Sequence, residues 1–585
     1  MSLIGIILLL PGNDSFAGGR LRNCGKPAAI YIMMAETNRG HVMTTKTAVI
    51  PAAGDSHSKV LPVSSNISDS MIPVNGKPII GYTLAELSSQ GFEQAVVVVK
   101  AVTPAMSRYV NFIRGDLRVD FVEAPFSKGV AHSVKLGMEK SSGEGSVVIL
   151  GDTICLDPLN SKTDFLYYQE VRDPSRWCVV KTDKAGLITG FIDKPVGPGA
   201  PKKALIGVYN ISDNSLFSEI AEGKLSESGG QLQLSSVFSE YIKKKPLRAE
   251  KCERWFDCGS PDTYFATKKR LLSSRSFNVL KFDEDLNTIR KESKNAQKLN
   301  DEISWYLSMP ERLKIFAPRL VGYSISEKPF LEQEYYGYNT LSELFLFQEL
   351  SPFVWDSILD YLSRIMQIFS EEKEPLPKDS VRDMYYEKTR QRLASPLPKR
   401  VKELILAKEV RLNGKEYAGW PRLEAELSKV VDSFYNPDYF GVLHGDLCFS
   451  NILCDPNNRI IKLIDPRGRF FVKGIHGDAQ YERAKLRHSA SGYEFIVNDM
   501  FNVKHGGGGF SLEFFYTDTQ RFVKEGIDRR IVASGFSLPR IRVIEGTLFL
   551  SMIPYHPEKE SRQIAMALLG IKLLNEGLDA LGHRS

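Results

Sequence analysis

The sequence predicts an α/β protein in which a doubly wound, mostly parallel sheet is followed by a second, α+β unit. Three observations lead to this prediction. The chain has 585 residues, whereas single domains commonly hold about 100–200. Its first half alternates short apolar runs with helix-like segments, which is typical of parallel sheets covered by helices. Its second half opens with a hairpin pattern and continues with helical segments.

Apolar runs in the first half have the length and composition of buried strands. They occupy residues 47–51, 95–100, 146–150, 177–181 and 204–211. Helix-like segments at 79–90 and 130–139 lie between some of them. In doubly wound sheets ligands bind at the carboxyl ends of the strands, so functional residues are expected directly after these runs.

In the second half, runs at 277–282 and 286–293 predict a hairpin around Asp283-Glu284-Asp285. A helix is expected at about 296–307, and a strand at 329–338. Further helices are expected at 354–372, 381–393 and 423–435. Two short strands at 452–454 and 460–464 flank the turn at 455–458. The four glycines at 506–509 have no strand–helix context and predict a flexible loop, not a phosphate-binding loop.

The composition is typical of a soluble globular protein, with 43% hydrophobic and 25% charged residues. The net charge of +6 is spread over 76 basic and 70 acidic side chains, so no nucleic-acid partner is expected. Seven cysteines without a C-x-x-C pair favour a reducing cytoplasm. The apolar run at 3–10 is shorter than the about 20 residues that span a bilayer, so no membrane insertion is expected. Residues 1–44 show no period and are expected to form a poorly ordered extension.

A glycine-containing loop follows the first predicted strand and makes a candidate nucleotide site. It reads Ala52-Ala53-Gly54, and backbone N–H groups in such a loop can approach phosphate oxygens. Lys59 follows it, and Lys77 lies in Pro73-Val74-Asn75-Gly76-Lys77-Pro78. Ala53, Gly54 and Lys77 are therefore expected to bind nucleotide, and Lys59 to act in catalysis.

Two acids complete this candidate site. Asp152 ends the strand Val147-Val148-Ile149-Leu150-Gly151-Asp152, and Asp257 lies in Trp255-Phe256-Asp257-Cys258-Gly259. Together they can hold one Mg²⁺ between a nucleoside triphosphate and an incoming phosphate.

These motifs resemble the nucleotidyltransferases that make nucleotide sugars and CDP-choline. The resemblance implies a nucleotidyltransferase domain over residues 45–272, with Asp152 and Asp257 as metal ligands. It also implies that Gly129, in Lys128-Gly129-Val130, contacts the base and that Lys194, in Asp193-Lys194-Pro195, binds the substrate phosphate.

The chain departs from this family where the family carries positive charge. The family loop usually reads Ala-Ala-Gly-x-Gly-x-Arg, but here the second Gly and the Arg are missing and Lys59 is displaced by about one position. The lysine found four residues before the Pro of the Pro73–Pro78 segment is Asp69 here. Either Lys59 or Lys77 supplies the missing charge, or the domain binds nucleotide without catalysis.

The second half contains His444-Gly445-Asp446-Leu447-Cys448-Phe449-Ser450-Asn451, followed by Ile464-Asp465-Pro466-Arg467. The carboxylate of Asp446 can accept a proton from a hydroxyl, and Asn451 and Asp465 can hold Mg²⁺ against a triphosphate. Upstream, Lys291 on a predicted strand and Glu302 on the next helix have the order of the pair that positions ATP phosphates in kinases.

This segment resembles the catalytic loop of the aminoglycoside phosphotransferase and choline kinase superfamily. The resemblance implies a two-lobed, protein-kinase-like domain at 273–585, with a small lobe at about 273–340 and a large helical lobe at about 341–585. It also implies that groups around Gln333 and Tyr335 bind adenine. His444 is expected to shape the loop, and Asp478 to cap or tether the next helix.

Together the halves predict consecutive reactions. A kinase would phosphorylate a small hydroxyl compound, a sugar or an amino alcohol, with ATP, and a transferase would couple that phosphate to a second nucleoside triphosphate. Analogy to choline-phosphate activation favours CTP. Such fusions resemble enzymes that activate building blocks for bacterial capsule or lipopolysaccharide. The alternatives are a kinase joined to a nucleotide-binding-only domain, and a drug-modifying phosphotransferase, which gives the first half no role.

Overall fold

The first half of the chain forms a sheet whose centre is parallel. The computed structural model describes residues 46–54, 68–159, 163–196, 202–228, 231–273 and 279–582. In the sheet order β10-β9-β11-β6-β1-β4-β5, β1 (Thr47–Pro51) is parallel to both β4 (Gln94–Val99) and β6 (Ser146–Ile149), and β4 is parallel to β5 (Arg118–Glu123). The remaining strands extend the sheet beyond β6, through β11: β8 (Phe165–Val171), β9 (Cys178–Thr182), β10 (Ile188–Asp193), β11 (Lys202–Ile211) and β12 (Arg248–Lys251).

Helices cover both faces of this sheet, which explains why its central strands are buried throughout. Every residue of β1 and β4 is buried. Ala48 and Ile50 pack with the helices on one face, and Val49 packs with those on the other. The first face carries α1 (Ile79–Ser89) and α2 (Pro104–Ile113), and the second carries α3 (Val130–Lys140), α4 (Asn214–Ser228) and α5 (Leu234–Lys244). The prediction of a doubly wound α/β first half is confirmed.

Two short ribbons and one helix complete the first half. The ribbons are β7 (Thr153–Cys155) with β13 (Trp255–Asp257), and β2 (Pro73–Val74) with β3 (Lys77–Pro78). α6 (Pro261–Ser273) then leads toward the second half.

The second half begins with a four-stranded antiparallel sheet in the order β14-β15-β17-β16. Its strands are β14 (Val279–Asp283), β15 (Thr288–Glu292), β16 (Leu320–Ser324) and β17 (Phe330–Glu334), with α7 (Ala296–Ser308) between β15 and β16. The predicted hairpin and helix at its start are confirmed, with ends within a few residues of those expected.

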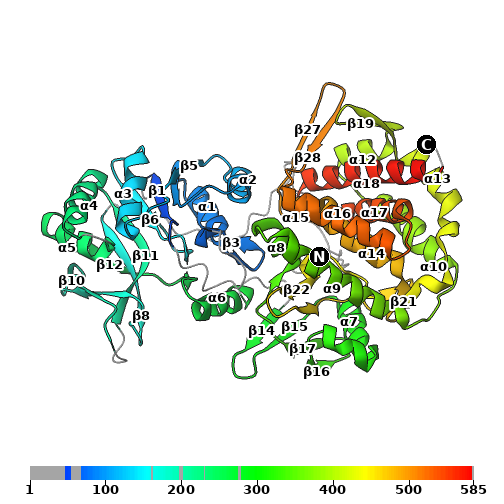
Figure 1. The fold of residues 1–585 in the computed structure, drawn as a ribbon, viewed down its shortest axis with the longest axis horizontal. Helices are drawn as coiled ribbons and strands as arrows, with labels where there is room; N and C mark the ends of the chain where they lie inside the picture. The colour runs from blue at the N-terminus through cyan, green and yellow to red at the C-terminus, as the bar shows by residue number, and fades with distance from the viewer. Residues whose placement is uncertain are drawn as a thin grey trace, which may run out of the picture.

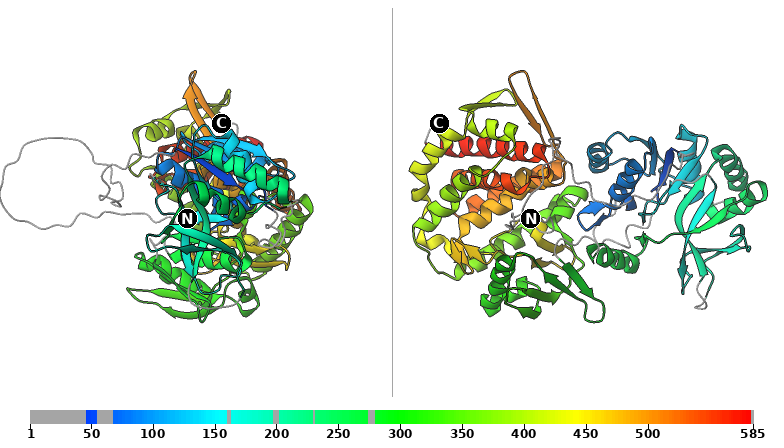
Figure 2. Two further views of the ribbon diagram at one scale, coloured as in Figure 1. Left: turned by 90° about the vertical axis from the view of Figure 1, so that its left-hand side faces the viewer. Right: turned by 180° about the vertical axis from the view of Figure 1, so that it is seen from behind.

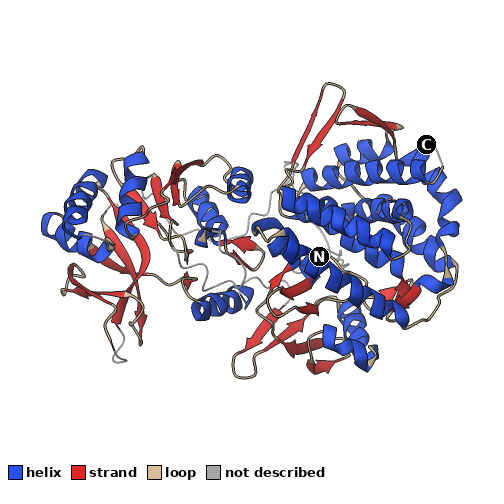
Figure 3. Ribbon diagram, in the orientation of Figure 1, coloured by secondary structure: helices blue, strands red, loops and turns tan. Residues whose placement is uncertain are grey.

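A larger, mostly helical lobe follows, as Figure 3 shows by its colouring. Its helices are α8 (Leu341–Phe347), α9 (Pro352–Glu371), α10 (Asp379–Arg382), α11 (Lys388–Leu393), α12 (Lys399–Leu406), α13 (Trp420–Val430), α14 (Ala479–His488), α15 (Glu494–Val497), α16 (Asp518–Ala533), α17 (Leu538–Met552) and α18 (Glu560–Ala580). The helix expected at 381–393 is divided, because a π-helical turn at Asp383–Glu387 separates α10 from α11.

Short strands in this lobe carry the candidate catalytic loop. They are β18 (Asn339–Thr340), β21 (Phe440–Val442), β22 (Ile452–Asp455), β23 (Ile460–Leu463), β24 (Arg469–Phe470), β25 (Val472–Lys473) and β26 (His476–Asp478). A separate sheet in the same lobe is formed by β19 (Glu409–Leu412), β20 (Lys415–Ala418), β27 (Asn502–Gly506) and β28 (Gly509–Glu513). The flexible loop expected at 506–509 is instead the tight turn of the β27–β28 hairpin, with Gly507 and Gly508 at φ of 58° and 77°. That prediction was wrong, because the flanking strands carry too little apolar alternation to be recognised.

The two halves touch along the hairpin β2–β3, α2 and α6, which face the second half in Figures 1 and 2. Lys268 of α6 donates to Gly337 O at 3.1 Å, to Tyr338 O at 3.3 Å and to Asn339 Oδ1 at 3.0 Å. The rings of Tyr109 and Phe347 meet edge to face at 5.2 Å. Polar and apolar contacts therefore fix the halves against each other.

Across the described ranges, no helix combines the length and apolarity that a membrane span requires.

Candidate functional site

Asp152 and Asp257, far apart in the sequence, lie side by side. β7 and β13 pair so that Asp257 faces Thr153, and Cys258 N–H donates to Asp152 O at 2.9 Å. A Cβ atom added to Gly259 would lie 2.8 Å from Asp152 Oδ2 and 3.4 Å from Asp257 Oδ1. The two carboxylates therefore converge on the small space that Gly259 leaves open.

The charges of these acids are only partly offset, because the charge of Arg176 acts on Asp257 but does not outweigh the effect of burial on its pKa. Burial, followed by the charges of Asp257 and Asp69, raises the pKa of Asp152 to about 7. Burial also raises the pKa of Asp257. Within the described ranges, neither carboxylate forms an ion pair with a lysine or arginine. Two converging carboxylates that no lysine or arginine of the described ranges contacts directly fit a hard divalent cation such as Mg²⁺, whose charge would offset their repulsion.

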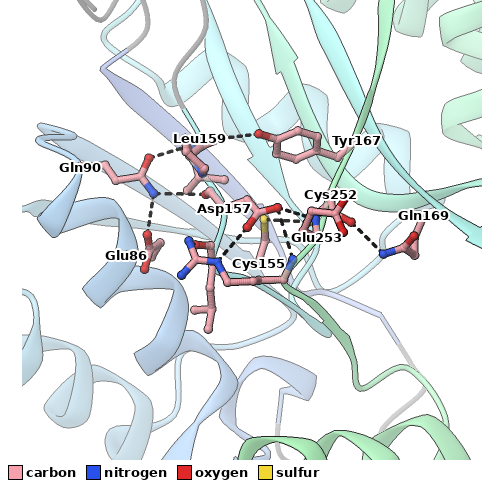
Figure 4. A network of polar contacts seen from close by, with 12 residues as sticks. Glu86, Gln90, Cys155, Asp157, Leu159, Tyr167, Gln169, Cys252 and Glu253 are labelled. Atoms are coloured by element: carbon pink, nitrogen blue, oxygen red, sulfur yellow. Dashed lines mark hydrogen bonds and ion pairs between the residues drawn. The ribbon is translucent and has the colours of Figure 1, made fainter. Parts of the chain in front are cut away.

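A polar network holds the segments that carry these acids (Figure 4). Asp157, which follows β7, accepts hydrogen bonds from Glu253 N at 2.5 Å and from Arg254 Nε at 2.9 Å. Cys155 Sγ lies 3.7 Å from Cys252 Sγ between the same segments. This clamp fixes the register of β7 against β13, and thereby the distance between Asp152 and Asp257.

The predicted glycine-containing loop lies beside Asp152. Gly151 N–H donates to Pro51 O at 3.1 Å, and a Cβ on Gly151 would come within 2.7 Å of Ala52 Cβ. Ala53 is buried and Gly54 is exposed at the end of β1. Lys59 lies outside the described residues.

Gly129 occupies a position that only glycine fits. It precedes α3 with φ of 102°, and a Cβ there would lie 2.5 Å from Leu232 O.

Lys77, on the hairpin β2–β3, has its Nζ atom 4.9 Å from the centre of the Tyr82 ring. Lys194 is exposed after β10 with φ of 42°, and its side chain contacts neither acid in the described part of the chain. The structure therefore groups Asp152, Asp257 and the loop, and in the described ranges it shows no direct contact of Lys194 with either acid.

In the second half, hydrogen bonds shape the loop that carries Asp446. His444 Nδ1 accepts from Asp446 N at 3.3 Å, so Nε2 carries the proton that it shares with Ile464 O at 2.9 Å. Burial lowers the pKa of His444 to about 4, which keeps the ring neutral. Glu482 of α14 accepts from Gly445 N at 2.8 Å. Asp478 caps α14 by accepting from Gln480 N at 2.9 Å.

Asp446 faces two cations. Lys485 Nζ lies 2.9 Å from Asp446 Oδ1, and Arg467 Nη2 lies 3.7 Å from Asp446 Oδ2. Burial alone would raise the pKa of Asp446, but Lys485 and then Arg467 outweigh it and hold the pKa well below its usual range. The carboxylate is therefore ionised, as a proton acceptor has to be.

Asn451 and Asp465 lie next to Asp446 and to the paired Lys291 and Glu302. Asn451 Nδ2 donates to Asp446 O at 2.9 Å, and Asn451 Oδ1 is buried with no hydrogen-bond partner among the described residues. Asp465 Oδ1 lies 2.9 Å from Lys291 Nζ, which also binds Glu302 Oε2 at 2.9 Å. An orphaned amide oxygen beside a carboxylate is a donor set that suits Mg²⁺.

A cavity of about 360 Å³ opens on these residues. It is lined by Lys291, Asp465 and Gln333, and also by Asn75 and Gly76 of the first half. The N–H groups of Glu334 and Tyr335 already donate to Arg319 O and Asn287 O, each at 3.0 Å. An adenine at this strand would therefore have to use carbonyls or side chains, and not those two amides.

Sequence reasoning missed Arg467 and Lys485 as neighbours of Asp446. One feature could have indicated the role of Lys485. Every residue of α14 is buried, and a lysine in a fully buried helix needs a negatively charged or polar partner. Arg467 follows Asp465 by two residues, and its guanidinium group lies next to the carboxylate of Asp446.

Comparisons with known proteins concern the first half. A family model described as nucleotidyl transferase matches residues 47–274. The glucose-1-phosphate thymidylyltransferase of Actinoplanes sp. is 28% identical over 225 residues, which is 36% of this chain and 72% of that protein. The bifunctional protein GlmU of Methanococcus aeolicus is 27% identical over 222 residues, covering 37% of this chain and 51% of that protein.

Among solved structures, UDP-glucose pyrophosphorylase in complex with UDP-glucose is 22% identical. The match covers 39% of this chain and 99% of that one, with a TM-score of 0.35.

Proposed function

We propose, from the premise that residues 47–274 are a nucleotidyl transferase domain, that this chain activates a sugar in two steps. In the first step, the unit at 279–582 transfers the γ-phosphoryl group of ATP to a hydroxyl. In the second step, the nucleotidyl transferase domain joins the resulting sugar phosphate to a nucleoside triphosphate and releases pyrophosphate. The product would be a precursor for a surface polysaccharide.

The convergence of Asp152 and Asp257 supports the transferase step. An oxygen of the sugar phosphate would attack the α-phosphorus while the bond to pyrophosphate breaks. A magnesium ion held by the two acids would screen the charges of the two phosphates. Ala53 and Gly54 would contact the triphosphate, Gly129 the base, and Lys77 and Lys194 the phosphates. The names of the thymidylyltransferase relatives favour a sugar 1-phosphate and dTTP; CTP stays a prediction without that support.

For the kinase step, the observation that carries the proposal is the ionised Asp446 beside the orphaned Asn451 Oδ1. The acceptor oxygen would attack the γ-phosphorus, and the bond between that phosphorus and the departing ADP would break. The hydroxyl proton would pass to Asp446. Asn451 and Asp465 would hold magnesium, which neutralises the phosphates. Lys291, fixed by Glu302, would bind the ATP phosphates, and the cavity beside Gln333 and Tyr335 would hold adenine.

Two product assays test these steps separately. ADP release is measured with ATP and a panel of sugars, polyols and amino alcohols, and pyrophosphate release with sugar 1-phosphates and dTTP, UTP, CTP or GTP. Asp446→Asn should abolish only ADP release, and Asp152→Asn only pyrophosphate release, each by orders of magnitude. If either variant keeps near-normal turnover in its own assay, the corresponding assignment is wrong.

The competing function is a kinase joined to a domain that binds nucleotide without catalysis. It is favoured by Asp69, a buried carboxylate where the resembled family has a lysine. Binding of dTTP or CTP without pyrophosphate release for any acceptor, including the kinase's own product, would establish this alternative.

A further inference from the structure

Two cations on α11 lie next to the Asp446 loop and have no part in the proposed phosphoryl transfer. Lys388 and Arg392 are one helical turn apart. The guanidinium carbon of Arg392 lies 4.7 Å from the centre of the Tyr555 ring, and Tyr555 lines the cavity described above. Lys388 Nζ lies 5.2 Å from the centre of the Tyr481 ring. Arg392 therefore packs on a residue of the cavity wall, and Lys388 lies one helical turn from it on the same helix.

These side chains join the two cations that flank Asp446. The hydroxyl of Tyr481, under Lys388, lies 3.1 Å from Arg467 Nη1, and Arg467 in turn faces Asp446. Arg392 also donates to Ser551 O at 3.1 Å, which fixes its direction. Lys388, Arg392, Arg467 and Lys485 thus form one cluster of four cations.

The positive charge of this cluster exceeds the negative charge that acts on it. Burial lowers the pKa of Lys388 well below its usual range, and Arg467, Arg392 and Lys485 lower it further, which the carboxylate of Asp383 does not offset. Burial likewise lowers the pKa of Arg392, against the carboxylate of Asp446. Crowded, partly desolvated cations are costly unless an anion joins them.

We propose that the kinase acceptor carries an oxyanion, a carboxylate or a phosphate, in addition to the hydroxyl that is phosphorylated, and that Lys388 and Arg392 bind it. This rests on the proposed kinase function. Lys485 and Arg467 contact Asp446 and act where the phosphoryl group is transferred. Within the described residues, Lys388 and Arg392 form no ion pair with Asp446, and they bind the oxyanion of the acceptor instead. Choline and other amino alcohols are rejected, because their positive charge would meet four cations.

The test is ADP release with acceptors that differ in charge only. Each neutral sugar is paired with its uronic or aldonic acid and with its phosphate ester, and choline and ethanolamine complete the panel. The acidic acceptors should have kcat/KM values at least about tenfold above those of their neutral counterparts, since hydrogen bonds to charged groups are strong. Comparing kcat/KM for the carboxylate acceptors with kcat/KM for the phosphate acceptors shows which oxyanion the site prefers.

Variants tie this preference to the two side chains. Lys388→Met and Arg392→Met should each raise KM for the acidic acceptor about 10- to 100-fold, with little change in kcat or in KM for ATP. Lys388→Arg should restore most of the loss, because it returns the charge. Lys399→Met, an exposed lysine on α12, is the matched control. A preference for neutral or cationic acceptors, or an acidic preference that survives both methionine variants, overturns the inference.

A binding readout separates this inference from the proposed kinase activity. Thermal shift is measured with sodium phosphate and sodium glucuronate, against choline chloride at equal ionic strength. If no acceptor consumes ATP, the kinase assignment fails, yet the two anions should still stabilise the wild type and not Lys388→Met. Equal effects of all three salts on both proteins would overturn the anion site by itself.

Discussion

Gly76 donates its backbone N–H to Glu343 Oε1 at 2.6 Å, and this hydrogen bond joins the hairpin β2–β3 of the first half to the first turn of α8 in the second. The same carboxylate accepts from Thr340 N at 2.8 Å through Oε2, as part of a capping box. Both Gly76 and Glu343 line the cavity proposed to hold ATP. The nucleotidyl transferase domain therefore supplies part of the wall of the cavity that we propose as the ATP site.

Replacing Glu343 should weaken both stability and ATP binding. Glu343→Ala removes the hydrogen bond that Thr340 N donates in the capping box, together with the bond to Gly76, while the side chain of the N-cap Thr340 stays; each lost hydrogen bond is worth about 0.5–1.5 kcal/mol. We expect a lower melting temperature and a higher KM for ATP. The exposed Glu327→Ala is the control in both measurements. An unchanged KM for ATP would mean that the hairpin does not shape the cavity.

The pH dependence of stability should reveal the raised pKa of Asp152. Its carboxyl ionises near 3.8 in the unfolded chain but at about 7 in the folded one. Between these values the unfolded state releases a proton that the folded state keeps, so Asp152 lowers the free energy of unfolding as the pH rises. Without metal, the melting temperature of Asp152→Asn relative to wild type should rise across this window, and magnesium should reduce the difference. Asp116→Asn, an exposed acid, should show no such trend.

The acid limb of the kinase pH profile should respond to Lys485. Lys485 and Arg467 hold the pKa of Asp446 low against the effect of burial. Lys485→Met leaves Arg467 alone, so the pKa of Asp446 should rise and the fall in kcat/KM on acidification should begin at a higher pH. The exposed Lys473→Met serves as the control. A drop in rate without movement of the limb would mean that Lys485 acts on the phosphate alone.

Gly129→Ala should impair the transferase domain. The added Cβ would meet the backbone of Leu232 at a φ of 102°, which we expect to cost about 1–3 kcal/mol and to raise KM for the nucleotide. Gly223→Ala is a matched control on α4, because a Cβ there meets nothing within 4 Å. It should be neutral or slightly stabilising. Equal melting temperatures for the two variants would contradict this assignment.

Much of the first half could be predicted because its signals are local. The run at 47–51 is apolar after Thr47, and it forms β1 with the same ends. Asp152 and Asp257 converge because each ends a short apolar segment at the same edge of the structure. The hairpin β27–β28 could not be predicted in this way, since its strands are largely exposed and their register depends on the Gly507–Gly508 turn.

The neighbours of Asp446 depend on tertiary packing instead. Lys485 lies on α14, Arg392 on α11 and Tyr555 after α17, and no spacing in the sequence brings them together. The contact of Gly76 with Glu343 depends on how the two halves dock, which no single motif encodes. Lys194 is a different case, because a motif marked it and the folded chain leaves it exposed, so its role in binding the substrate phosphate stays a prediction.

Lys291 serves Asp465 as a built-in counterion, with Nζ 2.9 Å from the carboxylate. We therefore expect the loop that carries Asp446 to fold without a metal ion, so that magnesium has little effect on the stability of the second half. The described surroundings of Asp152 offer no such counterion. If Asp152 and Asp257 bind magnesium as proposed, the ion should stabilise the folded first half, because binding and folding are then coupled.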